Sequence, residues 1–227
     1  LYNLVETVER GLDSDKLSDN EILDILKFVR TALQDDHEVI PVKVGRTIFT
    51  QLDKESFDII FNLCEGYMGK VQGESWMAAF VDLLGIPYTG SGPFTLSLCL
   101  DKARTKDILR ANEIPTPKYR VFLRKDEPID PDMEFPLIVK PLHEDGSVGI
   151  DQGSVVMAED KLRARVDYII KTYRQPALVE EFIDGRELNV AIMGNPPELE
   201  ILPISETAFD MKNGNHRIVD FDAKWVV

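Results

Sequence analysis

The fold is decided by residues 178–187, which read Leu-Val-Glu-Glu-Phe-Ile-Asp-Gly-Arg-Glu. The apolar start of this stretch predicts a strand, and that strand carries two adjacent carboxylates, Glu180 and Glu181. Burial of a carboxylate without hydrogen-bond donors is costly, and successive side chains of a strand point to opposite faces. One of the two acids is therefore expected to accept hydrogen bonds in a cleft while the other faces solvent. The alternative is a strand edge on which both acids are solvated.

An apolar run that ends in a lysine lies upstream of this strand. Residues 135–140 read Phe-Pro-Leu-Ile-Val-Lys, which predicts a strand with the ammonium group of Lys140 at its end. The following residues 143–149 read His-Glu-Asp-Gly-Ser-Val-Gly. Glycines allow a loop to expose consecutive backbone N–H groups to a phosphate, and a serine hydroxyl can add another donor. Taken alone, this pattern is also typical of an ordinary hairpin.

The first part of the chain alternates between predicted strands and predicted helices. Apolar residues at helical spacing predict helices over 19–34 and 76–84. Short apolar or extended runs predict strands over 37–44, 57–61 and 86–89. Alternation of this kind is typical of a parallel, doubly wound sheet.

The pattern changes near residue 97, where we expect a domain boundary. Beyond it the sequence predicts helices over 101–112 and 162–173, and strands over 135–140, 154–157, 178–183, 187–193 and 199–204. Strands that flank one helix and then run into further strands indicate an α+β module with antiparallel pairing.

The composition is that of an acidic globular protein. Among the 227 residues, Lys and Arg number 26 and Asp and Glu number 40, so the formal net charge is −14. Such a protein has no general attraction for nucleic acid or anionic lipid, and a polyanionic ligand needs a few locally placed cations. No apolar run reaches the roughly 18 to 20 residues of a membrane span, and no secretory signal is visible. We therefore expect a cytoplasmic protein that contacts neither nucleic acid nor membrane.

The two cysteines, Cys64 and Cys99, lie far apart and lack the spacing of metal ligands. This usage favours buried apolar thiols in a reducing compartment over a disulfide.

Taken in order, the motifs resemble the core of the ATP-grasp superfamily. The strand that ends Val-Lys-Pro at residue 141, the loop that ends Ser-Val-Gly-Ile at residue 150, and residues 179–187 are similar to that core in order and spacing. Further stretches are similar to D-alanine–D-alanine ligases in particular, namely residues 71–73, 84–92, 101–102, 114–117 and 222–225. Each motif is weak alone, but the ordered set is specific.

The resemblance implies an α/β protein that begins with a doubly wound pre-ATP-grasp domain over residues 1–97. An α+β ATP-grasp domain is expected to follow, with its small lobe over 98–177 and the start of its large lobe over 178–227. The C-terminal part of that domain is expected to be missing, because the family's magnesium ligands lie further along than Val227. ATP and Mg²⁺ are the implied cofactors, the Mg²⁺ ligands are expected beyond residue 227, and the chain as given is expected to be catalytically incomplete.

The activity implied by the resemblance is ATP-dependent ligation of a carboxylate to an amine. In such ligases the γ-phosphoryl group of ATP passes to a substrate carboxylate, and an amine then attacks the acyl phosphate. The implied partners are small molecules, an amino acid carboxylate and an amine, as in D-alanine–D-alanine ligation for peptidoglycan, and a homodimer is a candidate assembly. His143 and Glu65 differ from the usual ligase residues, which leaves the substrate open. The alternatives are an ATP-grasp ligase for a different amino acid or peptide, and a non-catalytic nucleotide-binding or regulatory module.

The resemblance also assigns the nucleotide contacts by position. Lys102 and Lys140 match the lysines that hold the α- and β-phosphates, although a lysine such as Lys102 is also typical of a solvated helix start. The flexible cover over the phosphates matches Gly146, Ser147, Val148 and Gly149. The hinge that reads adenine matches Glu180, Glu181, Phe182 and Ile183, and the ribose-hydroxyl acceptor matches Glu187.

Three residues match positions near the reacting groups. Lys224 matches the lysine beside the transferring phosphoryl group, although Trp225 stands where a tyrosine usually follows it. Ser147 lies in the cover, and Glu6 matches an acid that holds the amine of the first substrate. No metal ligand is assigned within the chain.

Overall fold

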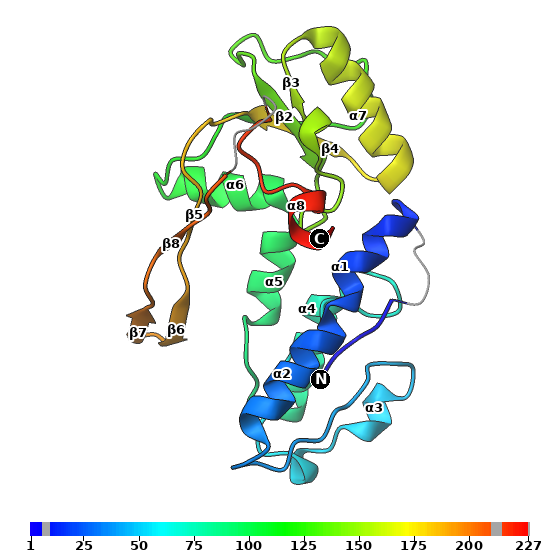
Figure 1. Ribbon diagram of the computed structural model, residues 1–227, viewed down its shortest axis with the longest axis vertical. Helices are drawn as coiled ribbons and strands as arrows, with labels where there is room; N and C mark the ends of the chain where they lie inside the picture. The colour runs from blue at the N-terminus through cyan, green and yellow to red at the C-terminus, as the bar shows by residue number, and fades with distance from the viewer. Residues whose placement is uncertain (6–9, 210–214, 227) are drawn as a thin grey trace.

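The computed structural model describes residues 1–5, 10–209 and 215–226. Its α-helices are α1 (Lys16–Asn20), α2 (Ile22–Leu33), α3 (Ile48–Gln51), α4 (Gly73–Leu84), α5 (Pro93–Leu100), α6 (Lys102–Ala111), α7 (Glu159–Tyr173) and α8 (Phe221–Trp225). Its strands are β1 (Tyr119–Phe122), β2 (Leu137–Pro141), β3 (Val155–Val156), β4 (Ala177–Glu181), β5 (Leu188–Asn189), β6 (Ile192–Asn195), β7 (Glu198–Ile201) and β8 (Ser205–Glu206). Short 3₁₀ turns occupy Asp13–Asp15, Lys54–Ser56 and Gln152–Ser154. The elements form two groups, one with α1 to α4 and one around β1 to β4 and α7 (Figure 1).

The first group contains short extended segments that lie side by side and run parallel. Isolated bridges join Tyr2 to both Lys43 and Leu63, and Ile60 to Tyr88. The order of these segments is therefore 42–44, 1–3, 60–63 and 87–89. The predicted strands over 37–44, 57–61 and 86–89 are reduced to these contacts, because one or two hydrogen bonds per neighbour do not make a ladder.

Helix α4 provides much of the apolar core of the first group. Met77 and Val81 of α4 pack with Ile48, and Gly85 ends the helix in the left-handed conformation, at φ +67°. Glycine adopts this conformation without steric cost. The predicted helix over 76–84 is confirmed.

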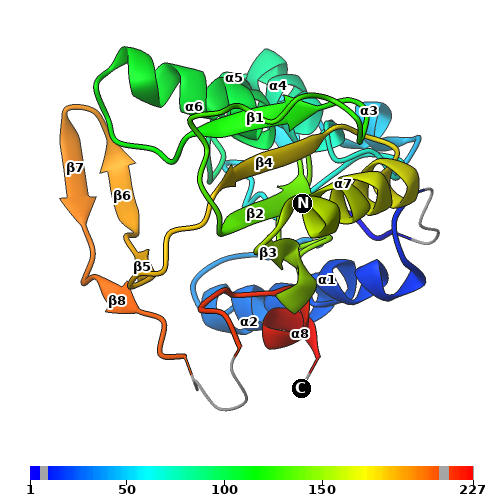
Figure 2. The same ribbon diagram turned by 90° about the horizontal axis from the view of Figure 1, so that it is seen from above.

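The second group is built on a four-stranded sheet of order β1-β4-β2-β3, in which every neighbouring pair is antiparallel. The antiparallel pairing predicted for this part of the chain is thus confirmed. One face of the sheet packs against α7, which Figure 2 shows alongside it. The buried side chains of this layer include Leu137, Val139, Val179, Leu162, Val166 and Ile169.

The opposite face of the sheet carries the polar residues. In the register of β2 and β4, Ile138 lies opposite Glu180 and Lys140 lies opposite Leu178. Lys140 and Glu180 are therefore diagonal neighbours on one face, a separation that long side chains span. Ile218, from the segment before α8, packs on Ile138 and covers part of this face.

The last strands form two small antiparallel pairs, β5 with β8 and β6 with β7. Their residues are exposed, and both views show them standing away from the four-stranded sheet (Figures 1 and 2). The predicted strands over 187–193 and 199–204 are present only as these shorter pieces.

Two positions bear on the expected organisation. Residue 97, the expected boundary, lies inside α5, which contacts both α4 and α6. Cys64 is buried, but Cys99 is exposed, so the prediction of a buried thiol at residue 99 is wrong. Helix α5 buries none of its residues, and the apolar sequence of this helix does not show that its side chains are exposed.

No helix in the described ranges is long and apolar enough to cross a bilayer.

Candidate functional site

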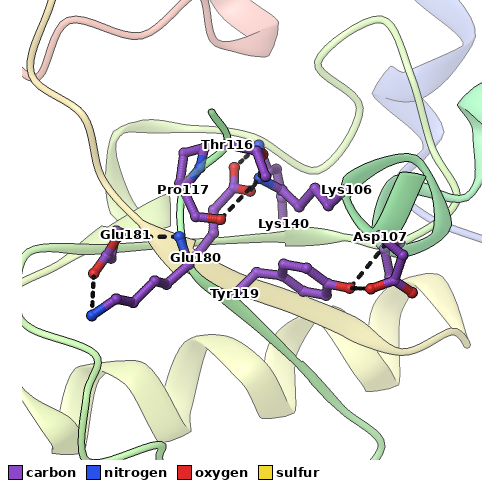
Figure 3. Close-up of polar contacts among 10 residues, drawn as sticks. Lys106, Asp107, Thr116, Pro117, Tyr119, Lys140, Glu180 and Glu181 are labelled. Carbon is purple, nitrogen blue, oxygen red and sulfur yellow. Dashed lines mark hydrogen bonds and ion pairs between the residues drawn. The ribbon is translucent and has the colours of Figure 1, made fainter. Parts of the chain in front are cut away.

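A buried carboxylate between two lysines marks the polar face of the sheet (Figure 3). Glu180 of β4 keeps only 7% of its side chain exposed and forms an ion pair with Lys140 of β2 through Oε1. The ammonium of Lys106, from α6, lies 2.7 Å from the other carboxylate oxygen, Oε2. Strand register brings Lys140 to this point, and Lys106 reaches it from outside the sheet.

The neighbouring carboxylate points the other way. Glu181 accepts a hydrogen bond from the backbone N–H of Lys118 at 3.1 Å, and the Lys118 ammonium lies 3.9 Å away. Its side chain is 27% exposed, compared with 7% for Glu180. The predicted division between one buried and one more exposed acid is confirmed, because alternation along β4 sends the two side chains to opposite faces.

The charges around Glu180 determine its protonation. Burial raises the pKa of this carboxyl group, but the nearby ammonium groups of Lys140 and Lys106 outweigh burial and hold the pKa below its usual value. Glu180 is therefore a carboxylate at neutral pH, and it compensates two cations in a place with little water.

Lys102, the first residue of α6, lies in the same electrostatic environment. Its ammonium donates to the carbonyl of Leu142 at 3.3 Å and to that of Glu144. Burial is the largest cause that lowers the pKa of Lys102 and the charge of Lys140 is the next; against the opposing effects of nearby acids that include Glu180, the pKa falls to about 8. The structure therefore brings Lys102, Lys140 and Glu180 together.

The glycine loop that follows β2 presents unpaired backbone donors. Gly146, Ser147 and Gly149 all have positive φ, at +53°, +63° and +74°. The hydrogen bonds found among the described residues leave the amides of these three residues without an acceptor, whereas the Val148 amide donates to Asp145 at 2.9 Å. Successive amides in left-handed conformations form concavities that bind anions.

The same loop is attached to the segment around α8. The Ser147 hydroxyl donates to the carbonyl of Val219 at 2.6 Å, and the Trp225 indole N–H donates to the carbonyl of Gly146 at 2.7 Å. From α7, Arg165 donates to the Gly149 carbonyl at 2.9 Å. A Cβ at residue 149 would meet Pro141 at 2.6 Å. The loop is therefore held at both ends, and residue 149 has no room for a side chain.

A cavity of about 570 Å³ lies beside this loop, where the two groups of elements meet. Its charged lining consists of the acids Asp15, Glu21, Glu65, Glu74, Glu144 and Asp145 and the bases Arg10, Lys70 and Lys224. Gly146, Val148 and Trp225 also line it. The acids outnumber the bases, and burial together with the charge of Asp145 raises the pKa of Glu74.

Some predicted site residues are not brought into these clusters. The Phe182 ring packs against His216, with centroids 5.6 Å apart, and Ile183 is 65% exposed. Glu187 is exposed next to β5, where its carbonyl accepts from the Thr207 amide at 2.9 Å. Glu6 lies outside the described residues.

Sequence reasoning missed Lys106, Arg165 and the contact of Trp225 with the loop. A signal for Lys106 exists, because it follows Lys102 by four residues and such residues share one face of a helix. No comparable pattern marks Arg165. Across the described ranges, no group of three or more His, Cys, Asp or Glu side chains is placed to hold a metal ion.

Comparison with known sequences finds one matching family. Residues 108–226 match the family described as "D-ala D-ala ligase C-terminus". "Uncharacterized protein y4sG" of Sinorhizobium fredii is 35% identical over 211 residues, which are 89% of this chain and 60% of that protein. A D-alanine–D-alanine ligase of Geobacter sulfurreducens is 32% identical over 83% of this chain and 55% of that protein. The chain thus spans a little over half the length of these relatives.

Comparison with solved structures finds the same fold. The D-alanine–D-alanine ligase of Bacillus anthracis complexed with ATP aligns with a TM-score of 0.55 and 20% identity, over 92% of this chain and 70% of that one. The D-alanyl-alanine synthetase A of Vibrio cholerae aligns with a TM-score of 0.61 and 17% identity, over 96% of this chain and 73% of that one.

Proposed function

Because this chain belongs to the D-alanine–D-alanine ligase family, we propose that it is the nucleotide-binding part of an ATP-dependent carboxylate–amine ligase. The proposed reaction proceeds through an acyl phosphate, with D-alanine–D-alanine ligation or a closely related reaction as the first candidate. One observation carries the proposal, namely the convergence of Lys102, Lys140 and Glu180 beside a loop with three unpaired amides.

The cationic groups suit a triphosphate in an otherwise acidic protein. We assign the α- and β-phosphates to Lys102 and Lys140, and the cover over them to residues 146–149. Phosphoryl transfer needs positioned positive charge and amide donors more than it needs a protein nucleophile. The proposed adenine contacts are the Glu180 carboxylate and the backbone of residues 181–183, with Glu187 as the ribose acceptor.

The proposed chemistry has two steps. A substrate carboxylate oxygen attacks the γ-phosphorus of ATP, the bond from that phosphorus to the β–γ bridging oxygen breaks, and ADP leaves. The amine of the second substrate then attacks the acyl carbon, loses a proton, and the tetrahedral intermediate releases phosphate. Lys224 lines the cavity beside the loop, and this supports its assignment to the transferring phosphoryl group, with Ser147 and Glu6 as the other proposed groups near the substrates.

A second candidate is a ligase of the same kind for a different amino acid or peptide. The acid-rich lining of the cavity favours this candidate. The side chain of D-alanine has no cationic group to pair with these carboxylates, whereas a basic substrate has one.

The proposal is tested by nucleotide release from the protein encoded by the whole reading frame that contains this chain. ADP and phosphate should appear only when both a carboxylate and an amine are supplied, and they are measured for a panel of neutral and basic D-amino acids with the L-enantiomers as controls. ADP release with D-alanine supports the first candidate, and release only with another amino acid supports the second. If the protein binds ADP but no pair of substrates promotes its release, the ligase assignment is wrong and a regulatory nucleotide-binding module replaces it.

Lys102 gives the nucleotide site a predicted pH dependence. Its pKa of about 8 in this structure must rise when a phosphate lies beside it, so binding takes up a proton above that pH. ADP affinity is expected to be constant up to about pH 8 and then to fall by up to about tenfold per pH unit. The phosphates are already ionised in this range. Isothermal titration calorimetry from about pH 7 to 9.5 measures the effect.

The matched control is Lys102→Arg, because a guanidinium keeps its charge throughout this range. Its ADP affinity should lack the fall above about pH 8. The same fall in both proteins would mean that another group titrates and that Lys102 does not contact the phosphates.

We further propose that Mg²⁺ accompanies the nucleotide, since metal ions commonly neutralise the charge of phosphates in phosphoryl transfer. The location that fits these substrates is the cytoplasm, where peptidoglycan precursors are made. A homodimer is the proposed assembly.

A further inference from the structure

We infer that Lys106 is a positioning residue for the nucleotide site. Its ammonium group compensates the negative charge of Glu180 when the ammonium group of Lys140 moves from that carboxylate to a phosphate. This inference rests on the proposed function, because it assumes that Lys140 contacts the phosphates. It deepens that function because it assigns a role to Lys106, a buried cation that is not among the proposed phosphate contacts.

The contacts of Lys106 fix it independently of Lys140. Its ammonium donates to the hydroxyl of Thr116 at 2.8 Å and lies 3.5 Å from the carbonyl of Pro117 (Figure 3). It lies 2.7 Å from Glu180 Oε2, and its side chain is only 10% exposed. Helix α6, the segment before β1 and strand β4 therefore meet at this one ammonium group.

Lys140 is held less firmly. Its side chain is 21% exposed, about twice the fraction of Lys106. The one hydrogen-bond or ion-pair partner that its ammonium has among the described residues is Glu180. In this structure Lys140 is thus bound to the carboxylate, and an ammonium drawn towards a phosphate has to weaken that pair.

The energetic consequence follows from the burial of Glu180. A buried carboxylate that loses its counter-charge is costly. Without Lys106, Glu180 would therefore retain the ammonium group of Lys140 and compete with the phosphates of the nucleotide for it. With Lys106 beside Oε2, the carboxylate keeps one cation throughout. Lys106 therefore lowers the cost of moving Lys140, although it pairs with the other carboxylate oxygen of Glu180.

The test is a double-mutant cycle that uses ADP as the probe. Lys106→Met removes the charge at similar length, and it is combined with Glu180→Gln, which removes the charge that Lys106 balances. Lys106→Met is expected to weaken ADP binding about tenfold in the otherwise unchanged protein, and less than about twofold in the Glu180→Gln background. Lys106→Arg, which keeps the charge, should restore most of the affinity. Isothermal titration calorimetry gives all the affinities.

The controls separate this role from a merely structural one. Thr116→Val removes the other side-chain partner of Lys106 and should leave ADP affinity within about twofold. An equal loss from Lys106→Met in both backgrounds would overturn the inference, because Lys106 would then act through the fold of its surroundings. If Lys106→Met does not fold, as judged by circular dichroism, Lys106→Gln replaces it with the same expectation. Absence of ADP binding by the unchanged protein would instead refute the proposed nucleotide site.

Discussion

Glu180→Ala is expected to lower the free energy of unfolding by about 3–5 kcal/mol, the usual cost of removing one partner from a buried ion pair. The substitution leaves the ammonium groups of Lys106 and Lys140 close together on one face of the sheet without the counter-charge of Glu180. Urea denaturation followed by circular dichroism at neutral pH measures the change.

Glu181→Ala is the matched control for this prediction, because it removes the same group from the next residue of the same strand. Its ion pair with Lys118 is longer and more exposed, and such pairs contribute less than about 1 kcal/mol. Equal losses from the two substitutions would mean that the two acids do not occupy different environments, and the charge network described for β4 would be wrong.

Lys140→Ala is expected to weaken ADP binding by about 10- to 150-fold, which corresponds to the roughly 1.5–3 kcal/mol of one charge-assisted hydrogen bond. Calorimetric titration with ADP at neutral pH measures the loss. Lys171→Ala is the control, because this lysine lies on α7, is 72% exposed and pairs with Asp167, four residues before it on the same helix. Unchanged ADP affinity in a folded Lys140→Ala protein would refute the placement of the phosphates.

Much of the second group of elements was predictable because its signals are local. The alternation of side chains along a strand was enough to separate Glu180 from Glu181, and apolar spacing was enough to find α7. Lys102 and Lys140 were predicted from family motifs, and their proximity depends on the register of β2 with β4. That register is set by packing over the whole sheet, and no short segment encodes it.

Other features depend on contacts between distant parts of the chain. Lys106 approaches Glu180 only because α6 lies against the face of the sheet away from α7, and helical spacing does not specify the partner of a helix face. The Trp225 bond to Gly146 joins residues that are 79 positions apart. The extended segments of the first group were predicted as full strands, but their apolar composition does not determine how many ladder hydrogen bonds they form.

The attachment of the glycine loop to α8 has a thermodynamic consequence. Gly146 and Val148 line the cavity, while the amides of Gly146, Ser147 and Gly149 are free to bind an anion. One short piece of chain therefore contacts both ligands, and because the loop is already held at both ends, an anion on its amides and a ligand in the cavity favour the same loop conformation. Such cooperativity is reciprocal, so a ligand in the cavity should raise the affinity of the loop for the anion by the same factor by which the anion raises the affinity for that ligand.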